Sequence, residues 1–140
     1  MDRISETKPK DAVGILVFTK DDDVLVAVVM QRNGDAWSYF GGEKQEGEPD
    51  IVAAQRWMRA QLGIDLPTEA LVPFARTQDS HGRCGFFATA LSDRPPASIW
   101  ALSQVGKYSS EMALDVPVMI EMAKLALTFP DDIFFTVDMK

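Results

Sequence analysis

The stretch that decides the fold is residues 42–64, GEKQEGEPDIVAAQRWMRAQLGI, a polar loop that runs into an amphipathic helix. Pro49 suits the first turn of that helix, because its fixed φ is preorganised there and its missing N–H has no helical partner to lose. Four apolar residues recur along one face at helical spacing: Ile51, Ala54, Met58 and Leu62. Gly63 follows directly and predicts the end of the helix, since glycine readily adopts the left-handed conformation that closes many helices.

The segments around this helix have the composition of β-strands. Runs of β-branched and apolar residues predict buried strands at 12–18 (AVGILVF) and 24–30 (VLVAVVM). A short strand is expected at 37–40 (WSYF), before the paired glycines. Two further strands, 71–77 and 84–91, flank a polar turn and so predict a hairpin. The chain therefore has enough strands for a central sheet.

A second helix is expected near the end of the sequence. Asp115 is its expected N-cap, and Pro130 is expected to end it. Its expected buried stripe has three members: Val118, Met122 and Leu125. Residues 133–139 (IFFTVDM) have strand composition and could add to a sheet edge in this chain or in a partner.

Residues 42–64 resemble the Nudix box, G-x5-E-x7-R-E-U-x-E-E-x-G-U, in which U is aliphatic. Six residues match at the required spacing without a gap: Gly42, Glu48, Arg56, Met58, Gly63 and Ile64. The order of strands, box helix, hairpin and late helix is also similar to that of Nudix domains. The resemblance implies an α+β protein with the Nudix fold, an α/β/α sandwich with a central mixed β-sheet. It implies a single Nudix-like domain at 11–140 after a flexible N-terminal tail at 1–10.

The box is degenerate at the positions where the family binds metal. Its three remaining glutamates are replaced by Trp57, Ala60 and Gln61. Positions i, i+3 and i+4 share one helical face, so the family's carboxylates converge there on divalent cations. An indole, a methyl group and a neutral amide are poor ligands for Mg²⁺, which prefers hard oxygen donors. We therefore expect no metal cofactor and negligible Nudix-type turnover.

Two residues of the box are retained, and the resemblance makes Glu48 and Arg56 the residual catalytic positions. A functional interpretation keeps a partial anion or metal site; a structural interpretation has Arg56 pair with Glu48 or a loop carbonyl to hold the loop. We favour the structural one. The candidate ligand-binding residues around the box are Arg32, Gly41, Gly42, Trp57, Arg59 and Gln61. Trp57 could stack on a base, plug the cleft or form an interface.

Composition excludes several classes of protein. The net charge of −7 disfavours binding to nucleic acid, because a polyanion would be repelled. No run approaches the roughly 20 apolar residues of a membrane span, so we expect no membrane partner and a cytoplasmic location. Cys84 is the only cysteine, which excludes an intrachain disulfide and a Cys-rich zinc site.

Three functional hypotheses follow. The first is a noncatalytic Nudix-fold protein that binds a nucleotide-like small molecule, or a protein partner, through the family's cleft. The second is an active hydrolase of a nucleoside diphosphate linked to another group, with Mg²⁺ or Mn²⁺ held by Glu48 and neighbouring loop acids. The third is a structural or assembly module, and the resemblance also implies a homodimer. We prefer the first because the carboxylates are missing.

Overall fold

The computed structural model describes residues 11–79, 82–93, 95, 97–105, 110, 112, 115–132 and 134–138. The tail predicted at 1–10 lies outside these residues. The strands are β1 (Ala12–Asp21), β2 (Val24–Asn33), β3 (Ala36–Ser38), β4 (Phe40–Glu43), β5 (Val72–Asp79), β6 (Gly82–Leu91), β7 (Ser98–Ala101) and β8 (Phe135–Asp138). The helices are α1 (Asp50–Leu62), η2 (Thr68–Ala70), α2 (Leu102–Val105) and α3 (Val116–Thr128). The single strand predicted at 37–40 is instead divided at Tyr39 between β3 and β4, and the other predicted strands and helices are present.

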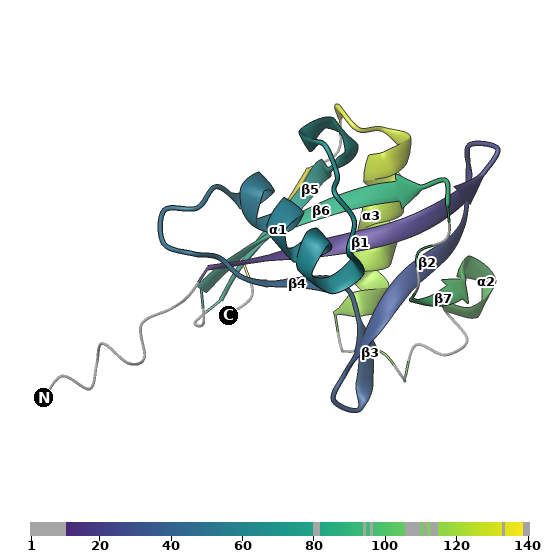
Figure 1. Ribbon diagram of the computed structural model, residues 1–140, viewed down its shortest axis with the longest axis horizontal. Coiled ribbons are helices and arrows are strands. Elements are labelled where there is room, and N and C mark those ends of the chain that lie inside the picture. The colour runs from purple at the N-terminus through teal and green to yellow at the C-terminus, as the bar shows by residue number, and fades with distance from the viewer. Residues whose placement is uncertain are drawn as a thin grey trace, which may run out of the picture.

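The strands form one mixed sheet in the order β3-β2-β1-β6-β5-β8 (Figure 1). Strand β1 runs parallel to β6, and β5 runs parallel to β8, whereas the other pairs are antiparallel. Strand β4 also pairs with β1, and β7 pairs with β2. The pairing of β1 with β4 places the paired glycines beside the start of the central strand.

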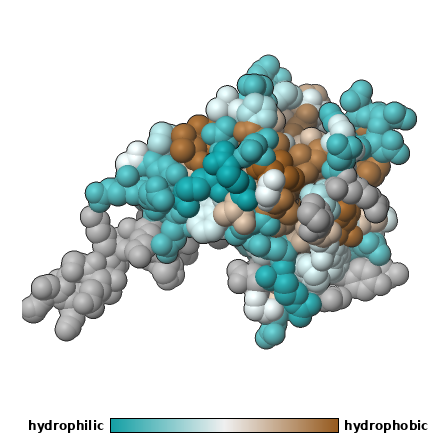
Figure 2. Space-filling view, viewed as in Figure 1, coloured by the Kyte–Doolittle hydropathy of each residue, from teal (hydrophilic) through white to brown (hydrophobic). Residues whose placement is uncertain are grey.

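Helices α1 and α3 cover opposite faces of the sheet (Figure 1). Successive side chains of β1 point to opposite faces, so this strand contributes to the core under each helix. Val13, Ile15 and Val17 pack in a core with α1, whereas Leu16 and Phe18 pack in a core with α3. The expected α/β/α sandwich is confirmed. In the space-filling view of the α1 side, hydrophilic residues cover much of the surface and hydrophobic residues gather beside α1 (Figure 2).

Helix α1 has the limits that its sequence predicts. Pro49 is its N-cap, and Gly63 ends it with φ 69°, its N–H donating to the carbonyl of Arg59. The buried side chains are Ala53, Ala54, Met58 and Leu62. Ile51, which we expected in the buried stripe, is only partly buried. The loop and helix of the box are thus fixed firmly against the sheet.

The buried face of α3 differs from the one predicted. Val118 and Leu125 are 60% and 47% exposed, and Met122 is only partly buried. The buried residues are instead Val116, Met119, Ile120, Ala123 and Ala126. Because apolar residues occur around the whole helix, spacing alone does not choose a face. The face with Ala123 and Ala126 can approach the sheet most closely, and it is the one buried.

The C-terminal strand pairs within its own chain. β8 lies parallel to β5, with Ala75 opposite Phe135 and Thr77 opposite Val137. Of the two placements that the sequence allowed for this C-terminal segment, residues 135–138 have the intrachain one. No helix in the described part of the chain is long and apolar enough to cross a membrane.

Candidate functional site

An arginine clamp closes the loop that joins β4 to α1. The guanidinium of Arg56 donates to both carboxylate oxygens of Glu48, each at 2.9 Å, and to the carbonyl oxygen of Glu43 at 3.1 Å. One oxygen of Glu48 also accepts the backbone N–H of Gln45 at 2.9 Å. Arginine has a planar fork that suits this bidentate geometry. The clamp therefore ties the helix to both ends of the loop.

These contacts hold Glu48 in its charged form. Hydrogen bonds from Arg56 first, and from the backbone of Gln45 second, lower the pKa of Glu48 to about 2. The same carboxylate raises the pKa of Arg56. The Glu48 side chain is only 8% exposed, so the clamp leaves little of the carboxylate accessible to a ligand. This geometry is the one that the structural interpretation of Arg56 requires.

Gln61 binds the backbone of Gly41 with both ends of its amide. The Gly41 N–H donates to Gln61 Oε1 at 2.9 Å, and Gln61 Nε2 donates to the Gly41 carbonyl at 3.2 Å. Gly41 has φ 126°, and a Cβ there would lie 2.1 Å from the carbonyl oxygen of Val13. Only glycine fits this position. Gln61 thus fixes a strand conformation that other residues cannot adopt.

Trp57 packs over the other glycine of the pair. A Cβ on Gly42 would lie 2.4 Å from Cζ2 of the Trp57 ring, so the ring lies directly against the glycine. The indole N–H donates to the carbonyl of Glu43 at 2.9 Å, and the Arg56 guanidinium lies over the ring at 5.1 Å from its centroid. Trp57 therefore holds the start of the loop as a packing residue.

The residues on this helix face do not fit the divalent-cation cage of the family. Trp57 and Ala60 offer no oxygen ligand, and the amide oxygen of Gln61 already accepts from Gly41. Glu48 is occupied by Arg56. Among the described residues, no group of three or more histidine, cysteine, aspartate or glutamate side chains could hold a metal ion. The polar side-chain atoms that remain on this face hydrogen-bond to β4 and the loop after it.

The two other candidate residues make different contacts. Arg32 is exposed; its guanidinium lies over Trp37 at 5.4 Å from the ring centroid. Arg59 is exposed and pairs with Asp65 near the C-terminal end of α1. Arg59 lies two positions from both Trp57 and Gln61, so it is rotated about 200° around the helix from each and faces away from them. The structure therefore brings together Gly41, Gly42, Glu48, Arg56, Trp57 and Gln61.

Sequence reasoning missed a partly buried polar pair on the α3 side of the sheet. The hydroxyl of Tyr39 donates to Asp115 Oδ2 at 3.1 Å, and the Tyr39 ring packs edge-on against Phe86 with centroids 5.2 Å apart. Burial first, and the charge of Asp115 second, raise the pKa of Tyr39 far above its usual range. Asp115 is the N-cap of α3 as predicted, but its side chain makes no cap hydrogen bond. No local pattern signals a pair 76 positions apart.

Comparison with known proteins gives the fold. No protein-family model matches the sequence, and no curated protein matches it. Among solved structures, the NUDIX domain of Shewanella oneidensis NrtR, complexed with ADP ribose, has a TM-score of 0.67 at 17% identity, over 91% of this chain and 94% of that one. A mutT/nudix family protein from Listeria innocua has a TM-score of 0.67 at 17% identity, over 87% and 96%. A NUDIX-family hydrolase from Clostridium perfringens has 0.61 at 12%, over 87% and 98%. With its mixed sheet between α1 and α3, this chain has the Nudix fold.

Proposed function

We propose that this chain is a noncatalytic Nudix-fold protein that binds a nucleotide-like small ligand beside the box helix. One observation carries the proposal: Trp57 and Gln61, at two of the positions where the family has metal-binding glutamates, hydrogen-bond to the backbone of Glu43 and Gly41. A neutral helix face cannot concentrate cations on a diphosphate. Without them, neither the attacking water nor the charge developing on phosphate is stabilised.

The ligand class is suggested by a similar structure. The NUDIX domain of Shewanella oneidensis NrtR is complexed with ADP ribose, and it aligns over 91% of this chain. At 17% identity the likeness reaches the fold alone. ADP-ribose is therefore a first probe of the proposal, and ADP is the second, because it keeps the diphosphate and lacks the terminal ribose.

The test combines binding and turnover measurements on the full chain. Calorimetric titration with ADP-ribose and with ADP should give a similar affinity in magnesium and in EDTA, because positions 57, 60 and 61 of the helix carry no carboxylate that could couple ligand to cation. Phosphate release from ADP-ribose, measured after phosphatase treatment of the products, should stay at background with Mg²⁺ or Mn²⁺. Metal-dependent turnover that Glu48→Gln abolishes would favour an active hydrolase instead. No binding across nucleotides and nucleotide sugars would refute the ligand class and turn attention to a protein partner.

A designed variant provides the matched control. Replacing Trp57, Ala60 and Gln61 together by glutamate restores the pattern of the family's box. In this variant the affinity for ADP-ribose should become dependent on magnesium, whereas that of the natural chain should not. Equal magnesium dependence in both proteins would show that cations bind elsewhere, and would contradict the reasoning from the helix face.

Homodimerisation and a cytoplasmic location stay predictions. Light scattering on the full chain and on a variant lacking residues 133–140 tests the first. An unchanged number of subunits would show that these residues hold no dimer together, whereas a change from dimer to monomer would support an assembly role for them.

A further inference from the structure

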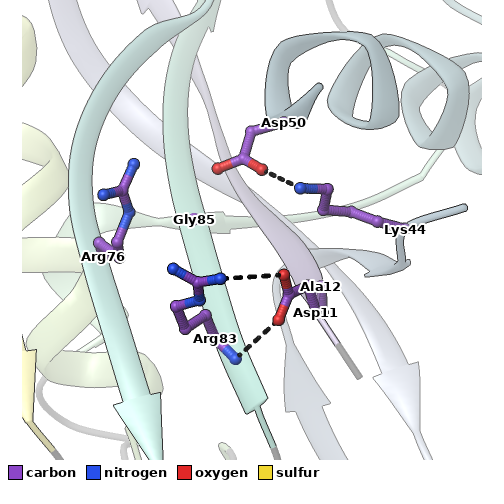
Figure 3. Close-up of a pocket in the computed structure, with 7 residues that line it drawn as sticks. All are labelled: Asp11, Ala12, Lys44, Asp50, Arg76, Arg83 and Gly85. Atoms are coloured by element: carbon purple, nitrogen blue, oxygen red, sulfur yellow. Dashed lines mark hydrogen bonds and ion pairs between the residues drawn. The ribbon is translucent and has the colours of Figure 1, made fainter. Parts of the chain in front are cut away.

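A charged pocket lies beside the N-terminal end of α1 and uses none of the side chains grouped at the box helix (Figure 3). Its volume is about 220 Å³. Its lining includes five charged residues and one glycine: Asp11, Lys44, Asp50, Arg76, Arg83 and Gly85. Strands β1, β5 and β6, the loop after β4 and the first turn of α1 all contribute to it.

The strand register explains why these residues meet. Phe87 of β6 packs in the α1 core, so Gly85 and Arg83, two and four positions earlier, point to the same face. Arg76 of β5 lies directly opposite Gly85 and shares that face. A Cβ at Gly85 would lie 2.4 Å from Asp50 Oδ2. The glycine therefore gives Asp50 room to cover the strand and keeps the floor of the pocket open.

The charges in the pocket are not balanced. Lys44 Nζ pairs with Asp50 Oδ1 at 2.6 Å. Arg83 pairs with Asp11, at 3.8 Å between side chains. Arg76 has no ion-pair partner within the described part of the chain, and in Figure 3 its guanidinium lies on the opposite side of Asp50 from Lys44. The pocket thus holds one surplus positive charge in a protein whose net charge is −7. Such a local surplus favours a small anion.

A more apolar pocket of about 290 Å³ adjoins the charged pocket. The two share Asp50, Arg76 and Gly85. The walls of the second include Ile51, Pro73, Phe87 and Phe134. Phe134 directly precedes β8 and is 52% exposed, a large fraction for a phenylalanine next to a cavity. Small-molecule sites commonly combine such apolar walls with a few polar groups that fix orientation.

We propose that the two pockets form one binding site for a small ligand with an anionic head and an apolar or aromatic body. Arg76, assisted by Lys44 and Arg83, binds the head, which is a phosphate or a carboxylate. Phe134 and Ile51 contact the body, which covers the exposed ring. The site goes beyond the proposed function, because it requires neither Trp57 and Gln61 nor a nucleotide.

Titration followed by two-dimensional amide NMR tests the site, with phenyl phosphate as the probe. Phenyl phosphate should bind more tightly than either inorganic phosphate or phenol, because only it carries both parts. The perturbed amides should include Arg76, Gly85 and Phe134. Benzoate in place of phenyl phosphate tells a carboxylate head from a phosphate head, and binding of either supports the site.

Variants separate the two halves of the site. Arg76→Gln should weaken phenyl phosphate binding at least about tenfold, the expected size of one lost charge-assisted bond. Lys124→Gln, the same charge change on exposed α3, should leave it unchanged. Phe134→Ser should weaken phenyl phosphate but not inorganic phosphate. Equal affinities for the natural chain and Arg76→Gln, or perturbations confined to other surfaces, would overturn the inference. ADP-ribose binding is measured separately, so the function above can fail while this site survives.

Discussion

Replacement of Gln61 by methionine should lower the free energy of unfolding by about 1–3 kcal/mol. Methionine keeps the length and helix propensity of glutamine but removes both hydrogen bonds to Gly41. Each such bond contributes about 0.5–1.5 kcal/mol net, and the half-buried Gly41 N–H and C=O lose their side-chain partner. Urea unfolding, followed by circular dichroism, measures the loss as a shift in midpoint at constant slope.

Gln55 provides a matched control on the same helix. Its side-chain amide is also part-buried, but it donates only one hydrogen bond, to the Leu66 carbonyl at 2.8 Å. Gln55→Met should therefore cost about half as much as Gln61→Met, roughly 0.5–1.5 kcal/mol. If the two variants lose equal stability, or Gln61→Met loses none, the hydrogen bonds of Gln61 to Gly41 do not hold β4 against the helix, and the interpretation of the helix face is wrong.

Three other perturbations have expected outcomes. The pKa of Glu48 falls from 4.5 to about 2 on folding, so its stabilising contribution is complete above pH 4.5 and is lost towards pH 2. Stability against pH should thus be flatter for Glu48→Gln, and parallel curves would contradict this. Gly41→Ala should lose about 3 kcal/mol or fail to fold, because φ 126° and a backbone oxygen at 2.1 Å exclude a side chain; near-normal unfolding would refute it. Tyr39, buried beside Asp115, should ionise only on unfolding; tyrosinate absorbance that rises earlier in the natural chain than in Tyr39→Phe would disagree.

Local pattern was sufficient for the elements that carry strong sequence signals. The box helix was predicted because its apolar spacing, Pro49 and Gly63 agree, and each acts within one or two turns. The face of α3 was predicted wrongly because its sequence, VPVMIEMAKLALT, is apolar on several sides. There the choice is made by contact with the sheet, where Ala123 and Ala126 are small enough to pack closely.

The sites divide in the same way. Five of the six residues that meet in the structure lie within the continuous box motif, and Gly41 directly precedes it, so the sequence could group them. The hydrogen bonds of Trp57 and Gln61 to the backbone of β4 were not foreseen. The pocket of Arg76 and Arg83 was missed because strand register, rather than sequence spacing, places them together. The space above Gly85 is likewise a tertiary feature, visible only once Asp50 lies over it.

The pairing of β8 with β5 has a consequence for how the chain is produced. The sheet order ends in β8. Between β5 and β8 the chain runs through residues 80–134, which include all of α3. During synthesis the N–H and C=O groups at the outer edge of β5 stay unpaired until residues 135–138 leave the ribosome. A bulky fusion placed directly after them would delay this closure further. Such a fusion should therefore raise aggregation of newly made protein more than the same fusion at the N-terminus.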